Sequence, residues 1–193
     1  MPRAVVITGP SGVGKGTLIR SLRTRMPDLQ LSVSATTRRP RTGETQGEDY
    51  HFMSPEEFEQ HVAAGDFVEH AEYAGARYGT LRSELETRSA SGAPVVLEIE
   101  VQGARQIRAT MPEAVQVFIA PLTIAALRAR LVGRGTDTPE QVEARLRTAE
   151  VELGAQDEFA RVVVNDRLED AVEELVEIVR DTTAAGGSDT LEA

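Results

Sequence analysis

The sequence has no cysteine and no tryptophan, and aromatic residues make up only 4% of it. Without cysteine, the chain forms neither disulfide bonds nor metal sites that use thiolate ligands. No stretch approaches the roughly 20 consecutive apolar residues that a membrane-spanning helix needs. The first residues run directly into an apolar, strand-like segment and show no signal-peptide pattern. We therefore expect a cytoplasmic protein that has no membrane partner.

Lysine is scarce too, because Lys15 is the only lysine among the 21 lysine and arginine residues. It lies in a glycine-rich segment that follows an apolar run and precedes an amphipathic one. The segment fits the pattern GxxxxGK of the phosphate-binding loop, whose backbone N–H groups and following helix hold an anion. A compact ammonium on a flexible stem suits such a cradle better than a planar guanidinium. The predicted phosphate-binding residues are Gly9, Pro10, Ser11, Gly12, Val13, Gly14, Lys15, Gly16 and Thr17.

The loop departs from the motif at its end. Gly16 stands where a serine or threonine hydroxyl normally meets Mg²⁺. We expect Thr17, the next residue, to supply that hydroxyl and to be the metal ligand.

The formal net charge of −10 argues against nucleic acid as a partner, since nonspecific binding needs a basic face. Local arginine clusters can still bind the phosphates of a small molecule. The sequence has two such clusters, the turn Arg38-Arg39-Pro40-Arg41 and the set Arg128, Arg130, Arg134, Arg145 and Arg147.

Strand-like and helix-like runs alternate, which predicts an α/β fold with a parallel sheet. We expect strands at 4–8, 95–101, 115–119 and 162–164, and a helix at 15–25. Residues 33–81 differ in composition and are interpreted as an inserted lobe with its own small sheet. Capping boxes at Ser54–Glu57 and Thr138–Gln141 predict two helix starts. After the second, apolar residues 142, 146, 149 and 153 recur at helical spacing.

The expected organisation is a core (1–32, 82–121 and 150–182), the inserted lobe (33–81), a helical lid (122–149) and a mobile tail (183–193). The tail assignment rests on the lack of apolar periodicity.

Several segments carry a resemblance to a known family. They are Gly9–Thr17, Ser32–Arg41, Gly43–Phe52, Glu69–Thr80, and Arg134–Asp137 with Arg145 and Leu146. These segments resemble guanylate kinases, which phosphorylate GMP with ATP, and the match extends from Arg3 to about Val179. The resemblance implies a three-layer P-loop NTPase fold with a GMP-binding lobe, ATP and GMP as partners, dGMP as a further acceptor, Mg²⁺ as cofactor, and a place in purine metabolism and GMP recycling. Monomer and homodimer both stay open.

The chemistry of GMP suits the same residues. Its phosphate accepts from arginine forks and tyrosine hydroxyls, and its guanine edge offers one acceptor, O6, and two donors, N1 and N2. We expect Arg38, Arg41, Tyr50 and Tyr78 on the phosphate, Glu69 on N1–H and N2–H, and Ser34 and Thr80 on O6 or N7. Adenine reverses this pattern and leaves the carboxylate unpaired.

Two carboxylates and two arginines complete the predicted site. In the expected strand 95–101, period 2 places Glu98 and Glu100 on one face, towards the edge where substrates bind. The family usually has aspartate where Glu100 stands. Arg134 and Arg145 are expected to close over the transferred group, and with Lys15 and Arg38 they make up the predicted catalytic set. We assign Arg130 and Asn165 to ATP; for Asn165 a simple strand-end turn is the alternative.

Other readings stay open. The Arg38–Arg41 turn can be merely solvated, the tyrosines can be packing residues, and Glu69 is one of 31 acids. A kinase for a ribose bisphosphate would need the arginines without the guanine-reading set. A GTPase is disfavoured because the chain has no Asn-Lys-x-Asp segment. A guanylate-kinase-like protein-binding module would keep the fold but typically lacks the loop lysine.

Overall fold

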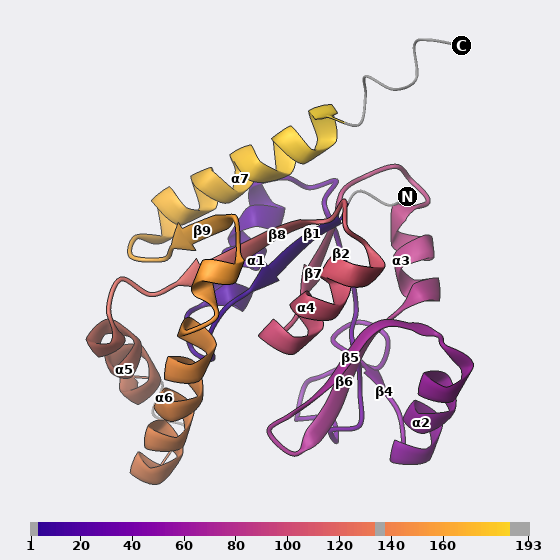
Figure 1. Cartoon of the computed structure of the whole chain (residues 1–193), viewed down its shortest axis with the longest axis horizontal. Helices are drawn as coiled ribbons and strands as arrows, with labels where there is room; N and C mark the ends of the chain where they lie inside the picture. The colour runs from indigo at the N-terminus through magenta and orange to yellow at the C-terminus, as the bar shows by residue number, and fades with distance from the viewer. Residues whose placement is uncertain (1–3, 134–137, 186–193) are drawn as a thin grey trace. The chain divides into compact units, whose positions relative to one another are not determined.

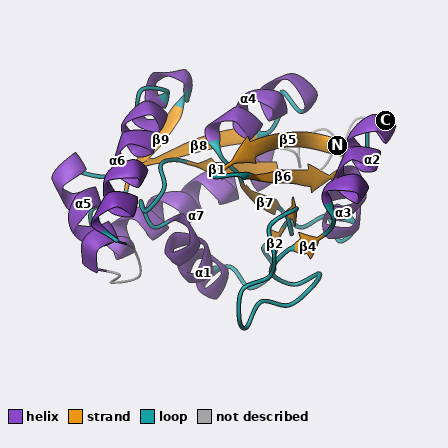
Figure 2. Cartoon of the chain, turned by 90° about the horizontal axis from the view of Figure 1, so that it is seen from below, coloured by secondary structure: helices purple, strands orange, loops and turns teal. Residues whose placement is uncertain are grey.

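The computed structural model of the chain describes residues 4–133 and 138–185. They form two compact units. Of the described residues, the terminal unit holds 5–28, 115–133 and 138–185, and the middle unit holds Ala4 and 29–114. Figure 1 labels the helices and strands, and Figure 2 separates them by type.

The terminal unit contains parallel strands and the helices that follow them. Its elements are β1 (Ala4–Thr8), α1 (Lys15–Arg25), β8 (Val115–Ala120), α5 (Ile124–Gly133), α6 (Pro139–Leu153), the 3-10 turn η1 (Gln156–Glu158), β9 (Arg161–Val164) and α7 (Leu168–Ala185). β8 pairs in parallel with both β1 and β9, with Val5 opposite Val115 and Val117 opposite Arg161. Helix α1 packs on α7, and α5 lies beside α6 (Figure 1).

The middle unit contains two groups of strands. Its elements are β2 (Gln30–Leu31), β3 (Ala35–Thr36), β4 (His51–Phe52), α2 (Pro55–Ala64), β5 (Phe67–Tyr73), β6 (Ala76–Leu81), α3 (Arg82–Ser89), β7 (Val95–Glu98) and α4 (Val101–Thr110). β2 and β7 pair in parallel. The other group is a four-stranded mixed sheet of order β4-β3-β6-β5, in which β5 and β6 form an antiparallel ribbon (Figure 2). Helix α4 packs against β5.

These strands confirm the predicted α/β class, the parallel strands and the small mixed sheet. Both capping boxes are present: Ser54 and Thr138 each accept from the backbone N–H three residues on, and Glu57 and Gln141 reach back. The small sheet has its own apolar cluster, built on Ala35, Phe58 and Phe67.

The predicted strand 95–101 is wrong beyond Glu98. The strand ends there, and Glu100 is the N-cap of α4, whose first residue is Val101. The Glu100 carboxylate accepts from the backbone N–H groups of Gln102 and Gly103, at 2.9 and 2.6 Å. A side-chain acceptor that satisfies N–H groups of the first turn favours a helix start over a continued strand.

The predicted start of the tail at 183 is also wrong, because α7 continues to Ala185. The Thr182 hydroxyl donates to the Ile178 carbonyl one turn earlier, at 2.8 Å. The next residues include an alanine pair, and alanine has the highest helix propensity. The rest of the expected tail, like the Arg134–Asp137 lid segment, lies outside the described residues. Among the described residues, no helix is both long enough and apolar enough to span a membrane.

Arg77, on β6, links α2 to the small sheet. Its Nη1 donates to Glu59 Oε2 at 2.6 Å, and its guanidinium lies 4.7 Å from the centre of the Phe58 ring. Its backbone N–H donates to Thr37 Oγ1 at 3.0 Å.

We expect Arg77→Ala to lower the free energy of unfolding by about 1 kcal/mol, because it removes a partly exposed ion pair and a cation–π contact. Urea unfolding measures this change. Glu59→Gln is the matched control, since it removes the ion pair and keeps the ring contact; its loss should be smaller. Equal losses in the two variants would contradict a role for the Phe58 contact.

Candidate active site

The glycine loop joins β1 to α1 in the terminal unit, as predicted. Gly9 has φ +140°, and a Cβ there would lie 2.3 Å from the Ile119 carbonyl oxygen on β8. Only glycine fits such an approach to a neighbouring strand. α1 then begins at Lys15, so its N-terminal N–H groups follow directly on the loop. This is the strand–loop–helix arrangement that binds phosphate.

The Lys15 ammonium lies over the loop itself. Its Nζ donates to the Gly9 carbonyl at 2.6 Å and to the Pro10 carbonyl at 3.3 Å. The positive charge is therefore held beside the loop amides, where a phosphate chain would need neutralisation.

Arg130 and Asn165, both predicted to contact ATP, meet at the loop carbonyl of Val13. Asn165 Nδ2 donates to this oxygen at 2.8 Å, and Arg130 Nη1 donates to it at 3.1 Å. Arg130 Nη2 also donates to the Asn165 carbonyl at 2.7 Å. Asn165 directly follows β9 and is buried. Arg130, from α5, and Asn165, after β9, together hold the loop at Val13. Contact with adenine stays a prediction.

A residue that the sequence did not single out also holds the loop. Glu152 Oε2 accepts from the backbone N–H of Ser11 at 3.0 Å, and the Glu152 side chain is only 9% exposed. It belongs to α6, where Val142, Leu146 and Ala149 form the predicted buried face. Glu152, rather than Leu153, continues that face. The sequence places the Glu152 carboxylate three residues after Ala149, on the apolar face of the helix. Because a buried charge needs a partner, this position indicates a contact with another segment.

Of the two predicted lid arginines, only Arg145 lies among the described residues. Arg145 is half-buried on α6, and Arg134 lies outside the described residues. Arg128, from the same sequence cluster, links α5 to α6 through a bidentate pair with Glu143. It is thus engaged in joining the two helices.

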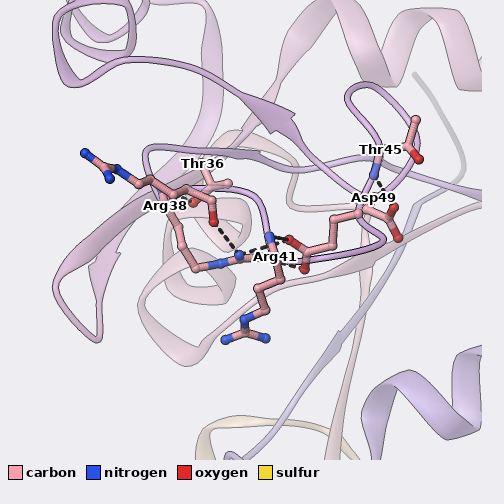
Figure 3. Close-up of polar contacts among 7 residues, drawn as sticks. Thr36, Arg38, Arg41, Thr45 and Asp49 are labelled. Carbon is pink, nitrogen blue, oxygen red and sulfur yellow. Dashed lines mark hydrogen bonds and ion pairs between the residues drawn. The ribbon is translucent and has the colours of Figure 1, made fainter.

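In the middle unit, Glu44 holds the arginine turn together, in which Arg38 and Arg41 lie close to each other (Figure 3). Its carboxylate takes both Nη groups of Arg38, at 3.0 and 2.9 Å, and the backbone N–H of Arg41 at 2.7 Å. The hydrogen bond with Glu44 raises the pKa of Arg38 above its ordinary value, and the bond with Arg38 lowers the pKa of Glu44. Glu44 was not among the predicted site residues, although an acid three residues after Arg41, across Gly43, is a sequence signal for this contact.

The structure brings the two predicted tyrosines together beside Arg38. The ring centres of Tyr50 and Tyr78 lie 6.1 Å apart, and the Arg38 guanidinium lies 5.1 Å from the centre of the Tyr50 ring. Burial and the negative charge of Glu98 raise the pKa of Tyr50, so its hydroxyl keeps its proton and can donate. Arg38, Tyr50 and Tyr78 thus lie together, and Glu44 balances the charge of Arg38. Phosphate binding by these residues stays a prediction.

The predicted guanine acceptor is buried in the same unit. Glu69, on β5, is 4% exposed, and its Oε1 accepts from the Thr80 hydroxyl at 2.6 Å. Burial, with the nearby charge of Glu100, raises the pKa of Glu69 to about 7. A hydroxyl has one hydrogen, so Thr80 orients Glu69 and cannot donate to a base at the same time. Ser34 is half-buried on the neighbouring segment, and Glu98 is exposed at the end of β7.

Comparisons with known proteins agree on one family. The family model described as guanylate kinase matches residues 1–182. The guanylate kinase of a Synechococcus strain is 53% identical over 173 residues, which cover 90% of this chain and 91% of that one. The guanylate kinase of Mycobacterium bovis is 51% identical over 179 residues, covering 92% and 86%.

Solved structures agree with this result. The crystal structure of guanylate kinase from Anaplasma phagocytophilum superposes with a TM-score of 0.75 at 32% identity, covering 97% of this chain and 87% of that one. The SH3-kinase fragment of tight junction protein 3 has a TM-score of 0.53 at 11% identity, covering 94% and 57%, and shows the fold alone.

Proposed function

This chain belongs to the guanylate kinase family, and we propose that it transfers a phosphoryl group from ATP to GMP, forming ADP and GDP, and accepts dGMP as well. The observation that carries the proposal is the Lys15 ammonium, held on the carbonyls of a glycine loop at the start of a helix. Protein-binding modules of this fold do not need that lysine, which favours the enzyme.

We assign the ATP phosphates to the terminal unit. The amides of Gly9–Thr17 and Lys15 would hold the β- and γ-phosphates, since converging N–H groups and one ammonium match their charge. Arg130, Asn165 and Glu152 hold this loop through Val13 and Ser11. Their contribution is to keep the amides oriented before the nucleotide binds.

We assign GMP to the middle unit. The phosphate would lie against the Arg38, Arg41, Tyr50 and Tyr78 donors, with Glu44 fixing the turn. The base would pair N1–H and N2–H with Glu69, and Ser34, Glu98 and Glu100 complete the predicted set. The contact between Thr80 and Glu69 supports this assignment, since a fixed acceptor discriminates better than a mobile one.

Transfer itself needs positioning and charge neutralisation more than proton chemistry. A GMP phosphate oxygen is already anionic, so no general base is required. Lys15, Arg38, Arg134 and Arg145 would neutralise charge on the transferred group. Because water competes as nucleophile, transfer should be efficient only when both nucleotides are bound.

Mg²⁺ is the expected cofactor. The described residues suit an ion that takes most of its ligands from nucleotide phosphates and water, and few from the protein. The described residues contain no group of three or more His, Asp or Glu side chains that could cage a metal. Thr17 offers one hydroxyl oxygen, which accepts from Arg20 Nη2 at 3.1 Å. Mg²⁺ commonly takes one or two protein oxygens together with water and phosphates, so Thr17 fits as its ligand if Arg20 swings away. When bound, the ion neutralises phosphate charge.

The decisive assay is ADP release from ATP and Mg²⁺ with GMP, dGMP, AMP, CMP, UMP or buffer alone, using the wild type and Lys15→Ala. We expect turnover with GMP and dGMP only, and a loss of about 10³-fold or more in Lys15→Ala, by analogy with other groups that neutralise the transferred phosphoryl. A folded wild type without turnover on any monophosphate would contradict the proposal. ATP binding without turnover would then indicate another acceptor, such as a ribose bisphosphate, and no ATP binding would indicate a binding module.

A further inference from the structure

Gly103 occupies a position where a helix has no need of glycine. It is the third residue of α4, it is buried, and its backbone is helical. Glycine in a helix costs about 1 kcal/mol relative to alanine. Alanine would therefore be the better residue here if only the helix mattered.

The space above Gly103 is taken by the carboxylate of Glu69. A Cβ at residue 103 would lie 2.3 Å from Glu69 Oε2 and 3.1 Å from its Cδ. Both distances are shorter than van der Waals contact allows. A glycine in α4 is thus what permits the Glu69 side chain, from β5, to lie against the helix.

Glu69 has little freedom to avoid such a clash. Its other oxygen, Oε1, is held by the Thr80 hydroxyl at 2.6 Å, and the side chain is 4% exposed. On the second side of Gly103, the backbone N–H donates to Glu100 Oε1 at 2.6 Å. Gly103 therefore lies between the two carboxylates that we assign to the guanine base.

We infer that Gly103 is a positioning residue for base recognition: the missing side chain sets where the Glu69 carboxylate lies, and through it the preference for guanine. The inference rests on the proposed role of Glu69 in binding the base. A methyl group at residue 103 would push the carboxylate away from Thr80 and out of register with N1–H and N2–H. ATP binding, which we assign to the terminal unit, would not change.

The test is Gly103→Ala, with kcat/KM measured for GMP and AMP. We expect the GMP-over-AMP ratio to fall by about tenfold or more, since a misplaced buried acceptor loses its hydrogen bonds, while KM for ATP stays constant. The melting temperature should fall, because the overlap with Glu69 and the lost hydrogen bond from Thr80 outweigh the helix propensity that alanine adds. A merely structural role would lower stability and leave the ratio unchanged. Ala109→Gly, at an exposed position of α4, is the control for helix propensity, and its ratio should equal that of the wild type.

A compensating variant makes the test specific. Glu69→Asp shortens the side chain by one methylene, so combining it with Gly103→Ala should recover part of the lost ratio, about threefold or more. If Gly103→Ala does not fold, recovery of folded protein in the double variant supports the clash, and failure of both overturns the inference.

Glu69→Gln, assayed in parallel, separates the two claims. If Glu69→Gln loses guanine preference and folded Gly103→Ala keeps it, the inference about Gly103 is wrong and the proposed site stands. If Glu69→Gln keeps the preference, the proposed role of Glu69 fails, and the inference about Gly103 fails with it.

Discussion

Arg145→Ala is expected to lower kcat by about 10³-fold, with little change in KM for either nucleotide. Arginines that neutralise the transferred phosphoryl group contribute on this scale, because their charge matters most in the transition state. A side chain that acts there lowers kcat and kcat/KM together. Arg145 is half-buried on α6, the same helix whose Glu152 holds the Ser11 amide. Steady-state kinetics with ATP and GMP varied separately measure the effect.

Arg147→Ala is the matched control, since Arg147 is exposed on the same helix two residues later. It removes an equal charge and should leave kcat within about twofold, because charges exposed to water are screened. Near-normal kcat in Arg145→Ala, or equal losses in both variants, would remove Arg145 from the transition-state role.

Glu69→Gln is expected to lower the GMP-over-AMP ratio of kcat/KM by about 10²-fold or more. The Glu69 carboxylate can accept from both N1–H and N2–H of guanine. The glutamine amide can accept only through its oxygen, and its NH₂ group would face a second donor of the base. A site built to hydrogen-bond its substrate discriminates strongly because mismatched buried groups stay unpaired. Glu72→Gln, an exposed acid on β5, is the control. A ratio unchanged from the wild type in Glu69→Gln would rule out the assignment.

The same carboxyl group predicts a pH dependence. Burial raises the pKa of Glu69 to about 7, and only the ionised form accepts both guanine protons. KM for GMP should therefore fall as pH rises from 6 to 8. In Glu69→Gln, only the titration of the GMP phosphate, with a pKa of about 6, should remain. A pH profile shared by the two proteins would show that Glu69 does not titrate in GMP binding.

The contribution of Glu69 to folding stability changes with pH in the opposite direction to its contribution to GMP binding. The ordinary pKa of this carboxyl is 4.5, and the folded state raises it. Between 4.5 and about 7 the folded protein therefore binds more protons than the unfolded chain, so stability from this group falls as pH rises. The full difference is about 3 kcal/mol, at 1.36 kcal/mol per pKa unit. Urea unfolding at pH 5 and 8 should show that Glu69→Gln removes this decline.

Features encoded by neighbouring residues could be predicted from the sequence. The glycine loop needs a strand, closely spaced glycines and a helix start, and Gly9, Lys15 and the apolar runs around them supply all of these within one segment. The capping boxes at Ser54 and Thr138 likewise depend on residues three apart. The strand end near Glu98 could not be placed, because an alternating pattern does not reveal that Glu100 caps the next helix.

The sequence by itself determined the chemistry of this protein: an α/β chain with a phosphate loop, one lysine in that loop, and an arginine and tyrosine set suited to GMP. These features follow from residue types at short spacings. Only the tertiary structure decided which side chains hold the active groups in place. Glu152 binds Ser11 across 141 positions, Asn165 reaches Val13 across 152, and Gly103 makes room for Glu69. Such contacts depend on how elements far apart in the sequence pack together, and local sequence patterns do not predict that packing.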